Sequence, residues 1–93
     1  MATKTKKKTS TSLEEKLGQP YIVMLHNDNY NSFDWVIECM MKICGHEYEA
    51  SSQIAHLVHF TGKCDVKRGN KEEMTKIYEK LKSANLTVTL ETS

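Results

Sequence analysis

Residues 25–35, with the sequence LHNDNYNSFDW, place a run of polar side chains between two apolar segments. Asn27, Asp28 and Asn29 supply amide and carboxylate oxygens, which accept hydrogen bonds. A protonated amine has only donors to offer, so a group of acceptors on one turn suits an ammonium ion. The turn is therefore a candidate amine-binding site. The competing interpretation is an ordinary polar turn that leads from a strand into a helix.

One histidine and several apolar residues fit the same interpretation. The neutral imidazole of His59, near the C-terminal end of a predicted helix, adds one more acceptor. Acceptors beside an apolar hole would recognise a molecule that carries an amine next to a hydrophobic group. The apolar residues that the sequence offers for such a hole are Phe33, Val36, Ala55 and Val58.

The cysteines and histidines do not have the spacing of a metal site. Cys39 and Cys44 are five residues apart on one predicted helix, which turns their thiols about 140° from each other. His56 and His59 share a helix face, but no third ligand follows at a suitable spacing, and no C-x-x-C motif is present. We expect neither a metal nor a cofactor.

Two thiol–imidazole pairs can be drawn, Cys44 with His46 and Cys64 with His59. Neither is accompanied by a glycine-rich elbow, an oxyanion-binding turn or a phosphate-binding loop. We therefore predict no catalytic residues and no enzymatic activity. An odd number of cysteines, three, favours reduced and mostly buried thiols in a cytoplasmic protein.

Hydrophobic periodicity predicts the elements that position the turn. Residues 21–25 have the continuous apolar pattern of a well-covered strand. Asn31, with Asp34 three residues later, predicts the N-cap of a helix over residues 33–44, which Gly45 ends. Polar residues interrupt this helix only along one narrow stripe, so we expect most of its surface to be buried.

The rest of the chain predicts two more helices and two more strands. A helix over residues 47–61 has its core stripe at Ala50, Ile54, Leu57, Val58 and Thr61. Alternation predicts a strand over 64–68 and a final edge strand over 86–90. Between them Asn70 caps a helix whose core stripe is Met74, Ile77, Tyr78 and Leu81. The predicted fold class is α/β (α+β), a single small domain of order β-α-α-β-α-β, with three helices on one face of a three-stranded antiparallel sheet.

Composition divides the chain into a flexible Lys/Thr/Ser-rich extension, residues 1–19, and a folded domain, residues 20–93. Four of the 13 basic residues are lysines within the first eight positions, which leaves nine basic against twelve acidic residues, a net charge of −3, for residues 9–93. A mildly acidic domain is a poor nucleic-acid surface. No apolar run approaches the ~18 residues that span a bilayer. We expect neither nucleic acid nor membrane as a partner.

Three segments together form a specific combination of motifs. They are N-D-N-Y-N-S-F-D-W-V after the first strand, S-S-Q-I-A-H-L-V-H-F-T-G-K at the end of the second helix, and L-T-V-T-L-E in the last strand. In this order and spacing they resemble the ClpS family, bacterial and plastid adaptors that deliver proteins to a Clp AAA+ protease. The resemblance covers about residues 20–91.

The resemblance implies a module that binds destabilising N-terminal residues (Leu, Phe, Tyr or Trp), known as N-degrons, without covalent change. It implies that Asn27 and His59 hold the free α-amino group with help from Asp28 and Asn29, and that Asn31 caps the helix and bonds the peptide backbone. The implied partner is the N-terminal domain of a Clp AAA+ unfoldase of the ClpA or ClpC type. We expect the adaptor to be a monomer. The implied pocket for the first side chain consists of Phe33, Val36, Ala55, Val58 and Leu86.

The chain departs from the family pattern at three positions that bear on binding. Asn29 stands where the family usually has a second Asp, so one carboxylate that would offset the ammonium charge is missing. Phe33 and Ala55 stand where the family often has Met, which reshapes the mouth and the wall of the pocket. The missing carboxylate is the best support for an alternative, a module of this fold that docks on the chaperone without binding N-degrons.

Overall fold

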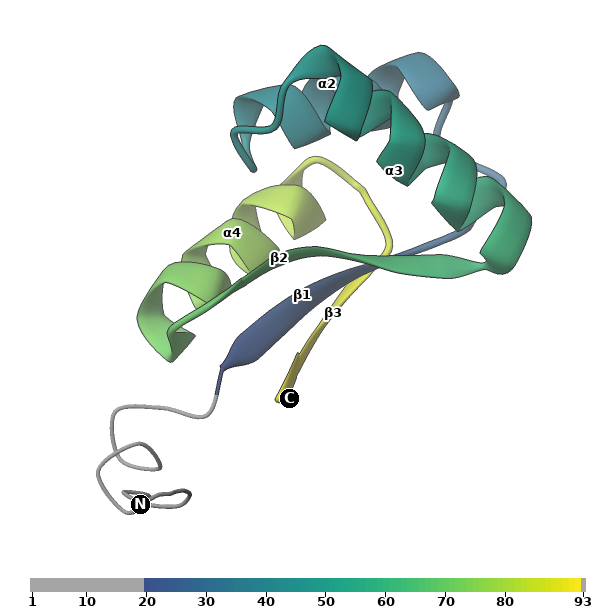
Figure 1. The fold of residues 1–93 in the computed structure, drawn as a ribbon. Helices are drawn as coiled ribbons and strands as arrows, with labels where there is room; N and C mark the ends of the chain where they lie inside the picture. Colours follow the sequence, from purple (N-terminus) through teal and green to yellow (C-terminus); the bar gives the residue numbers. More distant parts are fainter. Residues whose placement is uncertain (1–19, 93) are drawn as a thin grey trace, which may run out of the picture.

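The computed structural model describes residues 20–92, and the predicted extension of residues 1–19 lies outside them. The described part has the predicted β-α-α-β-α-β order, with three helices and one three-stranded antiparallel sheet (Figure 1). None of these helices within residues 20–92 is long and apolar enough to cross a membrane. The strands are β1 (Tyr21–His26), β2 (Lys63–Gly69) and β3 (Val88–Thr92), and the helices are α2 (Phe33–Lys42), α3 (Tyr48–Thr61) and α4 (Lys71–Ser83).

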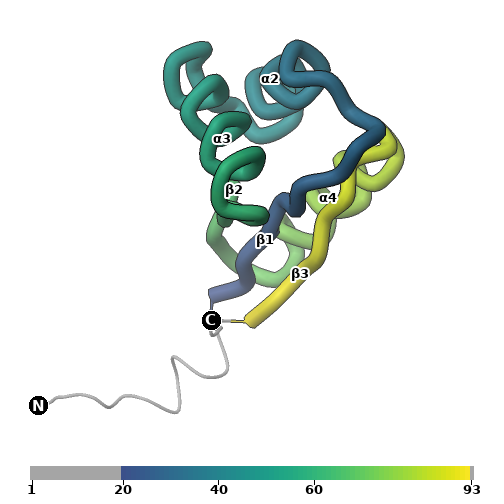
Figure 2. The backbone as a smooth tube through the Cα atoms, turned by 90° about the vertical axis from the view of Figure 1, so that its right-hand side faces the viewer, coloured from purple at the N-terminus to yellow at the C-terminus, as the bar shows by residue number. Residues whose placement is uncertain are grey.

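Strand β1 is the centre of the sheet, which has the order β2-β1-β3. Figure 2 shows β1 running between its two neighbours, both of which pair with it in antiparallel fashion. Leu25 illustrates the register, since it lies opposite Cys64 of β2 and Val88 of β3. Val23 and Leu25 are 0% and 1% exposed, which confirms β1 as the covered strand and β3 as an edge strand.

Helix α4 packs against the sheet as its sequence predicts. Met74 and Leu81 are buried, with Ile77 and Tyr78 partly buried against the same core. Asn70 is the N-cap, and its side-chain oxygen accepts a 2.8 Å hydrogen bond from the backbone N–H of Glu73. All three helices lie on one side of the sheet (Figure 1).

The predicted cap of α2 is wrong, because Ser32 and not Asn31 occupies the N-cap position. Ser32 has extended backbone angles, and its hydroxyl accepts a 3.1 Å hydrogen bond from the N–H of Trp35. The Asn31 side chain is drawn instead into contacts with other parts of the fold, described below. Two adjacent residues could each cap this helix, and long-range hydrogen bonds decide between them.

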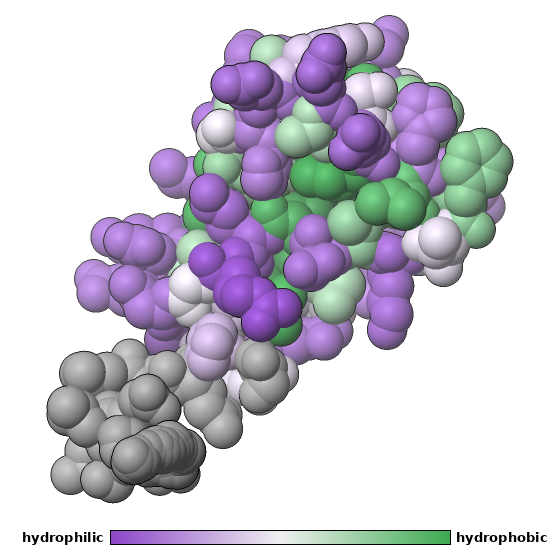
Figure 3. All heavy atoms as spheres, in the orientation of Figure 1, coloured by the Kyte–Doolittle hydropathy of each residue, from purple (hydrophilic) through white to green (hydrophobic). Residues whose placement is uncertain are grey.

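The prediction that most of α2 is buried is also wrong. Only Cys39 and Met40 of this helix are buried, and Trp35 and Met41 are each 40% exposed. A helix at the edge of so small a domain contacts its neighbours along one stripe only. Apolar residues on its other faces therefore stay exposed. Figure 3 shows hydrophobic side chains gathered on one face of the molecule. They lie between two layers, one formed by α2 and α3 and the other by α4 and β2.

The buried stripe of α3 is turned away from the predicted one. Ala50, Leu57 and Thr61 are exposed, Leu57 by 48%, although Ile54 and Val58 are buried as expected. Ser51 and Ala55 complete the observed stripe. Both are small residues, and the larger Leu57 is left outside the buried stripe.

Candidate functional site

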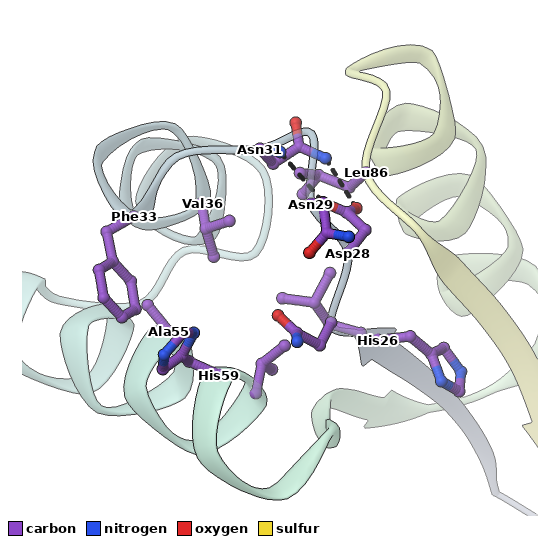
Figure 4. A pocket seen from close by; sticks show the side chains of 12 residues that line it. His26, Asp28, Asn29, Asn31, Phe33, Val36, Ala55, His59 and Leu86 are labelled. Carbon is purple, nitrogen blue, oxygen red and sulfur yellow. Dashed lines mark hydrogen bonds between the residues drawn. The ribbon is translucent and has the colours of Figure 1, made fainter.

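A pocket of about 280 Å³ opens where the C-terminal end of β1, the start of α2 and the second half of α3 meet. The structure brings all ten residues proposed from the sequence around this pocket and adds two from β1, Leu25 and His26. Figure 4 shows the ring of His26 pointing away from the space that the other labelled side chains enclose. The predicted set consists of Asn27, Asp28, Asn29, Asn31, Phe33, Val36, Ala55, Val58, His59 and Leu86.

The end of β1 is joined directly to the end of α3. The backbone N–H of Asn27 donates a 2.9 Å hydrogen bond to the carbonyl of Gly62, three residues beyond His59. Gly62 closes α3 in the left-handed conformation, with φ of 97°, which glycine adopts without steric cost. This contact brings His59 to the same pocket as the polar turn, although 32 positions separate Asn27 from His59 in the chain.

Asp28 organises the turn. Its Oδ1 accepts hydrogen bonds from the backbone N–H groups of Tyr30 and Asn31 at 2.9 and 3.0 Å. Its Oδ2 accepts from the Asn31 amide at 2.9 Å and from the Thr87 hydroxyl at 2.6 Å. Burial raises the pKa of the Asp28 carboxyl, but these hydrogen bonds outweigh it and hold the pKa below its usual value. The carboxylate is therefore ionised at neutral pH, with its four lone-pair positions filled.

The turn is also fastened to the connection between α4 and β3. The Asn31 amide donates to the Asn85 carbonyl at 3.0 Å, and the Trp35 indole N–H donates to the Ala84 carbonyl at 3.0 Å. Figure 2 shows the chain after β1 running beside this connection. Thr87, Trp35 and Asn85 were not singled out from the sequence, because no local pattern relates residues that lie 49 to 59 positions from their partners.

The free acceptors lie beside the apolar part of the pocket. Among residues 20–92, no hydrogen bond engages the side chains of Asn27, Asn29 or His59, and all three line the pocket. Ala55, Val58 and Leu86 form a buried wall, while Phe33 at the start of α2 is 42% exposed. In Figure 4, Phe33 and Val36 come from one side, Leu86 from another, and Ala55 and His59 from α3 below.

The three cysteines are free, with Cys39 and Cys44 buried and Cys64 partly buried. Burial raises the pKa of all three thiols, that of Cys44 to about 11, which keeps them protonated and weakly nucleophilic at neutral pH. The His46 ring is hydrogen-bonded to the Val66 carbonyl at 2.7 Å. Within residues 20–92, no three His, Cys, Asp or Glu side chains form a group that could hold a metal ion.

A solved structure with a similar fold is that of Agrobacterium tumefaciens ClpS2 bound to L-phenylalaninamide. It superimposes with a TM-score of 0.69 at 20% sequence identity, over 81% of this chain and 98% of that one. This likeness establishes the fold.

Sequence comparison connects the chain to named relatives. It is 37% identical over 60 residues to the ATP-dependent Clp protease adapter protein ClpS of Desulforapulum autotrophicum, a match over 62% of this chain and 58% of the relative. It is 40% identical over 52 residues to the protein of the same name from Lawsonia intracellularis, over 54% and 48% of the two chains. The matched segments thus span about half the length of these relatives.

The family model described as "ATP-dependent Clp protease adaptor protein ClpS" matches residues 16–89. That span includes the polar turn, both sides of the pocket and every element of the sheet except the end of β3. The description names an adaptor and no catalytic activity. This chain belongs to the ClpS family of Clp protease adaptor proteins.

Proposed function

We propose that the protein is an adaptor that binds the free N-terminal α-amino group and the bulky hydrophobic first side chain of a substrate protein. The observation that carries the proposal is the composition of one pocket. It combines three side chains with unused acceptors, Asn27, Asn29 and His59, with a buried apolar wall. The acceptors match the donors of an amino terminus, and the adjoining apolar wall matches the hydrophobic side chain of the same residue.

The size of the pocket suits a single side chain. Its volume of about 280 Å³ lies just below the ~300–1,000 Å³ that is usual for sites of drug-sized ligands. We infer that one residue enters and that the rest of the polypeptide stays outside. Bulky hydrophobic residues, Leu, Phe, Tyr or Trp, gain most from the apolar wall, because burial of their surface is worth about 25 cal/mol per Å².

The polar residues have different parts in this proposal. Asn27 and His59 accept hydrogen bonds from the ammonium group, and Asn29 supplies a further amide oxygen. Asp28 attracts the ammonium by its charge, since its lone pairs are already filled by protein donors. Both N–H groups of the Asn31 amide are likewise used, so its Oδ1 is the atom left to accept a backbone N–H of the substrate.

The partner in this proposal is the N-terminal domain of a Clp AAA+ unfoldase of the ClpA or ClpC type, which receives the substrate from a monomeric, cytoplasmic adaptor. The family match supports an adaptor of a Clp protease. The three free cysteines fit a reducing compartment.

Peptide titration tests the binding step. Labelled peptides that begin with Leu, Phe, Trp, Ile or Val are titrated with the full chain by fluorescence anisotropy, each with a free and with an acetylated N-terminus. Acetylation removes donors and charge, which leaves buried acceptors unpaired at about 1–3 kcal/mol each. We therefore expect at least about ten-fold tighter binding of the free form, and more for Leu, Phe and Trp than for Val.

The outcomes separate the candidate functions. Equal binding of free and acetylated peptides, or no binding of either, removes the N-degron proposal. In the second case, retained binding to the unfoldase N-terminal domain would support the alternative, a module that docks without N-degrons. Turnover that is lost after thiol alkylation would instead indicate an enzyme.

A further inference from the structure

Four rings form a closed array at the mouth of the pocket. Phe33 of α2 stacks on His56 of α3, with ring centroids 5.0 Å apart and planes 28° from parallel. His56 also stacks on Phe60, with centroids 6.3 Å apart and planes at 23°. His59 closes the array with a tilted contact to Phe33 at 5.4 Å and an edge contact to Phe60 at 5.1 Å. These separations lie in the range of favourable aromatic pairs, about 4.5–7 Å.

The array separates two depressions of the surface. Phe33 and His59 line the substrate pocket, whereas His56 and Phe60 line a more open, apolar depression on the outer side of α3, together with Gln53 and Leu57. His56 therefore contacts Phe33 without lining the pocket that Phe33 helps to form. His56 thus reaches the pocket directly through Phe33, and by a longer route through Phe60 and His59.

The ring of His56 is itself held in place. Its Nδ1 lies 2.8 Å from the backbone carbonyl of Ser52, one turn earlier on α3. Since a carbonyl only accepts hydrogen bonds, Nδ1 carries the proton and donates. This hydrogen bond fixes the plane of the imidazole and gives Phe33 a fixed surface on which to stack.

A fixed Phe33 has a consequence for the choice of ligand. Its ring is 42% exposed, and without a contact of this kind such a side chain samples several rotamers. A ring that is already ordered can pair with an aromatic side chain in the pocket without a further loss of entropy. An aliphatic side chain of similar size gains burial from the same wall but no ring–ring contact. Ala55 is the smallest side chain in the buried wall of the pocket.

We propose that His56 is a positioning residue that fixes Phe33 at the pocket mouth, and that the pocket thereby prefers an aromatic first residue to an aliphatic one. The proposal rests on the proposed function and specifies its substrate class. The preferred substrates are those that begin with Phe, Tyr or Trp, and the less preferred ones begin with Leu or Ile. His56 does not itself line the pocket that holds the acceptors for the amine, so comparing two free-amine peptides in its variants separates side-chain preference from amine binding.

The test is the ratio of Kd values for two free-amine peptides that differ only in a first residue of Leu or Phe. For the unaltered protein we expect the Phe peptide to bind about three- to ten-fold more tightly, the range that a ring–ring contact provides. In His56→Ala the ratio should fall below about two-fold, with Kd for the Leu peptide changed by less than about two-fold. His56→Phe keeps a ring on which Phe33 can stack and should retain the preference.

Gln53→Ala is the matched control, because Gln53 lies on the same helix and beside the same depression but outside the ring array. It should behave as the unaltered protein. The chemical shifts of the Phe33 ring protons, measured by NMR without ligand, should move toward values for a freely rotating ring in His56→Ala and stay in His56→Phe.

Three results would overturn the inference while leaving amine recognition intact. They are equal affinity of the unaltered protein for the two peptides, an unchanged ratio in His56→Ala, and equal weakening of both peptides in that variant. Absence of binding by every free-amine peptide to the unaltered protein would instead remove the proposed function and the substrate class with it.

Discussion

The hydroxyl of Thr87 donates a 2.6 Å hydrogen bond to Oδ2 of Asp28, across 59 positions of the chain. One residue precedes β3 and the other follows β1, so the bond joins the two strands just beyond the last pair of their ladder. It fixes the turn that carries Asn27 and Asn29. The shape of the candidate amine site thus depends on a contact between the two ends of the domain.

Replacing Thr87 by Val keeps the size of the side chain and removes this bond. A half-buried carboxylate loses one of its four donors, so we expect the free energy of unfolding to fall by about 0.5–1.5 kcal/mol. Urea denaturation followed by circular dichroism measures it. Thr87→Ser retains the hydroxyl and should stay within about 0.5 kcal/mol of the unaltered protein. Equal stability of the Val and Ser variants would contradict the role given to the bond.

The Asp28 carboxylate should make stability depend on acid pH. Its pKa is lower in the folded protein than the usual 3.8, because hydrogen bonds to the ionised form outweigh burial. A carboxyl group with a depressed pKa stabilises the fold above the unfolded value, and this contribution is lost as pH falls through the folded value. Asp28→Asn should therefore destabilise the protein at pH 7 by about 1–3 kcal/mol. The difference should shrink below pH ~3.8, and a gap that stays constant from pH 7 to 2 would argue against an ionised Asp28.

Substrate binding should weaken as the pH drops from 7 to 5, a range in which the free peptide amine stays protonated. Protonation turns the imidazole of His59 from an acceptor into a donor and sets a cation against the ammonium group. Kd for a free-amine Phe peptide, measured across this range, should rise for the unaltered protein and rise much less for His59→Asn. A flat profile in both proteins would remove His59 from amine recognition.

Restoring a carboxylate at position 29 should tighten amine binding. Asn29 lines the pocket with an exposed amide, and Asp there adds a negative charge close to the ammonium group. Because exposed charges are strongly screened, we expect about a two- to five-fold gain in affinity for free-amine peptides at low salt, fading at high salt. Acetylated peptides serve as the uncharged control. A gain of equal size for both forms would mean that the substitution acts on shape and not on charge.

Removing one buried hydroxyl should stabilise the fold. Ser51 is 0% exposed on the face of α3 that packs against the rest of the domain, and within residues 20–92 its Oγ has no hydrogen-bond partner. Ser51→Ala removes an unpaired polar atom and raises helix propensity, so we expect a gain of about 0.5–2 kcal/mol. Ala50→Ser, at the adjacent exposed position, is the control for propensity alone. A loss of stability in Ser51→Ala would indicate that the hydroxyl bonds to its own helix.

Local patterns in the sequence predict the elements well and the buried face of α4, but not the buried faces of α2 and α3. Asn70 caps α4 as predicted because its partner, the N–H of Glu73, is three residues away. Asn31 does not cap α2, because Asp28 and the Asn85 carbonyl compete for its amide. Leu57 is predicted as a core residue from its hydrophobicity, yet it is 48% exposed, and Ser51 and Ala55 are buried on α3 instead. For Asn31, unlike Asn70, one deciding contact is with Asn85, in a part of the chain that periodicity does not identify.

The members of the candidate site could be proposed from the sequence, whereas the bonding within it could not. Motif resemblance brings Asn27 and His59 together, and the backbone bond from Asn27 to Gly62 gives the physical reason for their proximity. Nothing local relates Thr87 to Asp28 or His56 to Phe33. These pairs exist only because the strands and helices that carry them are packed side by side.

The position of β1 at the centre of the sheet also fixes when the pocket can form during synthesis. Tyr21 pairs with Gly69 on one side and Thr92 on the other, so β1 is synthesised before either of the strands that pair with it, β2 and β3. Leu86 and Thr87, which supply part of the wall and the anchor for Asp28, emerge from the ribosome just before β3. A nascent chain therefore has no complete pocket with which to engage an amino terminus until Leu86 and Thr87 have left the ribosome.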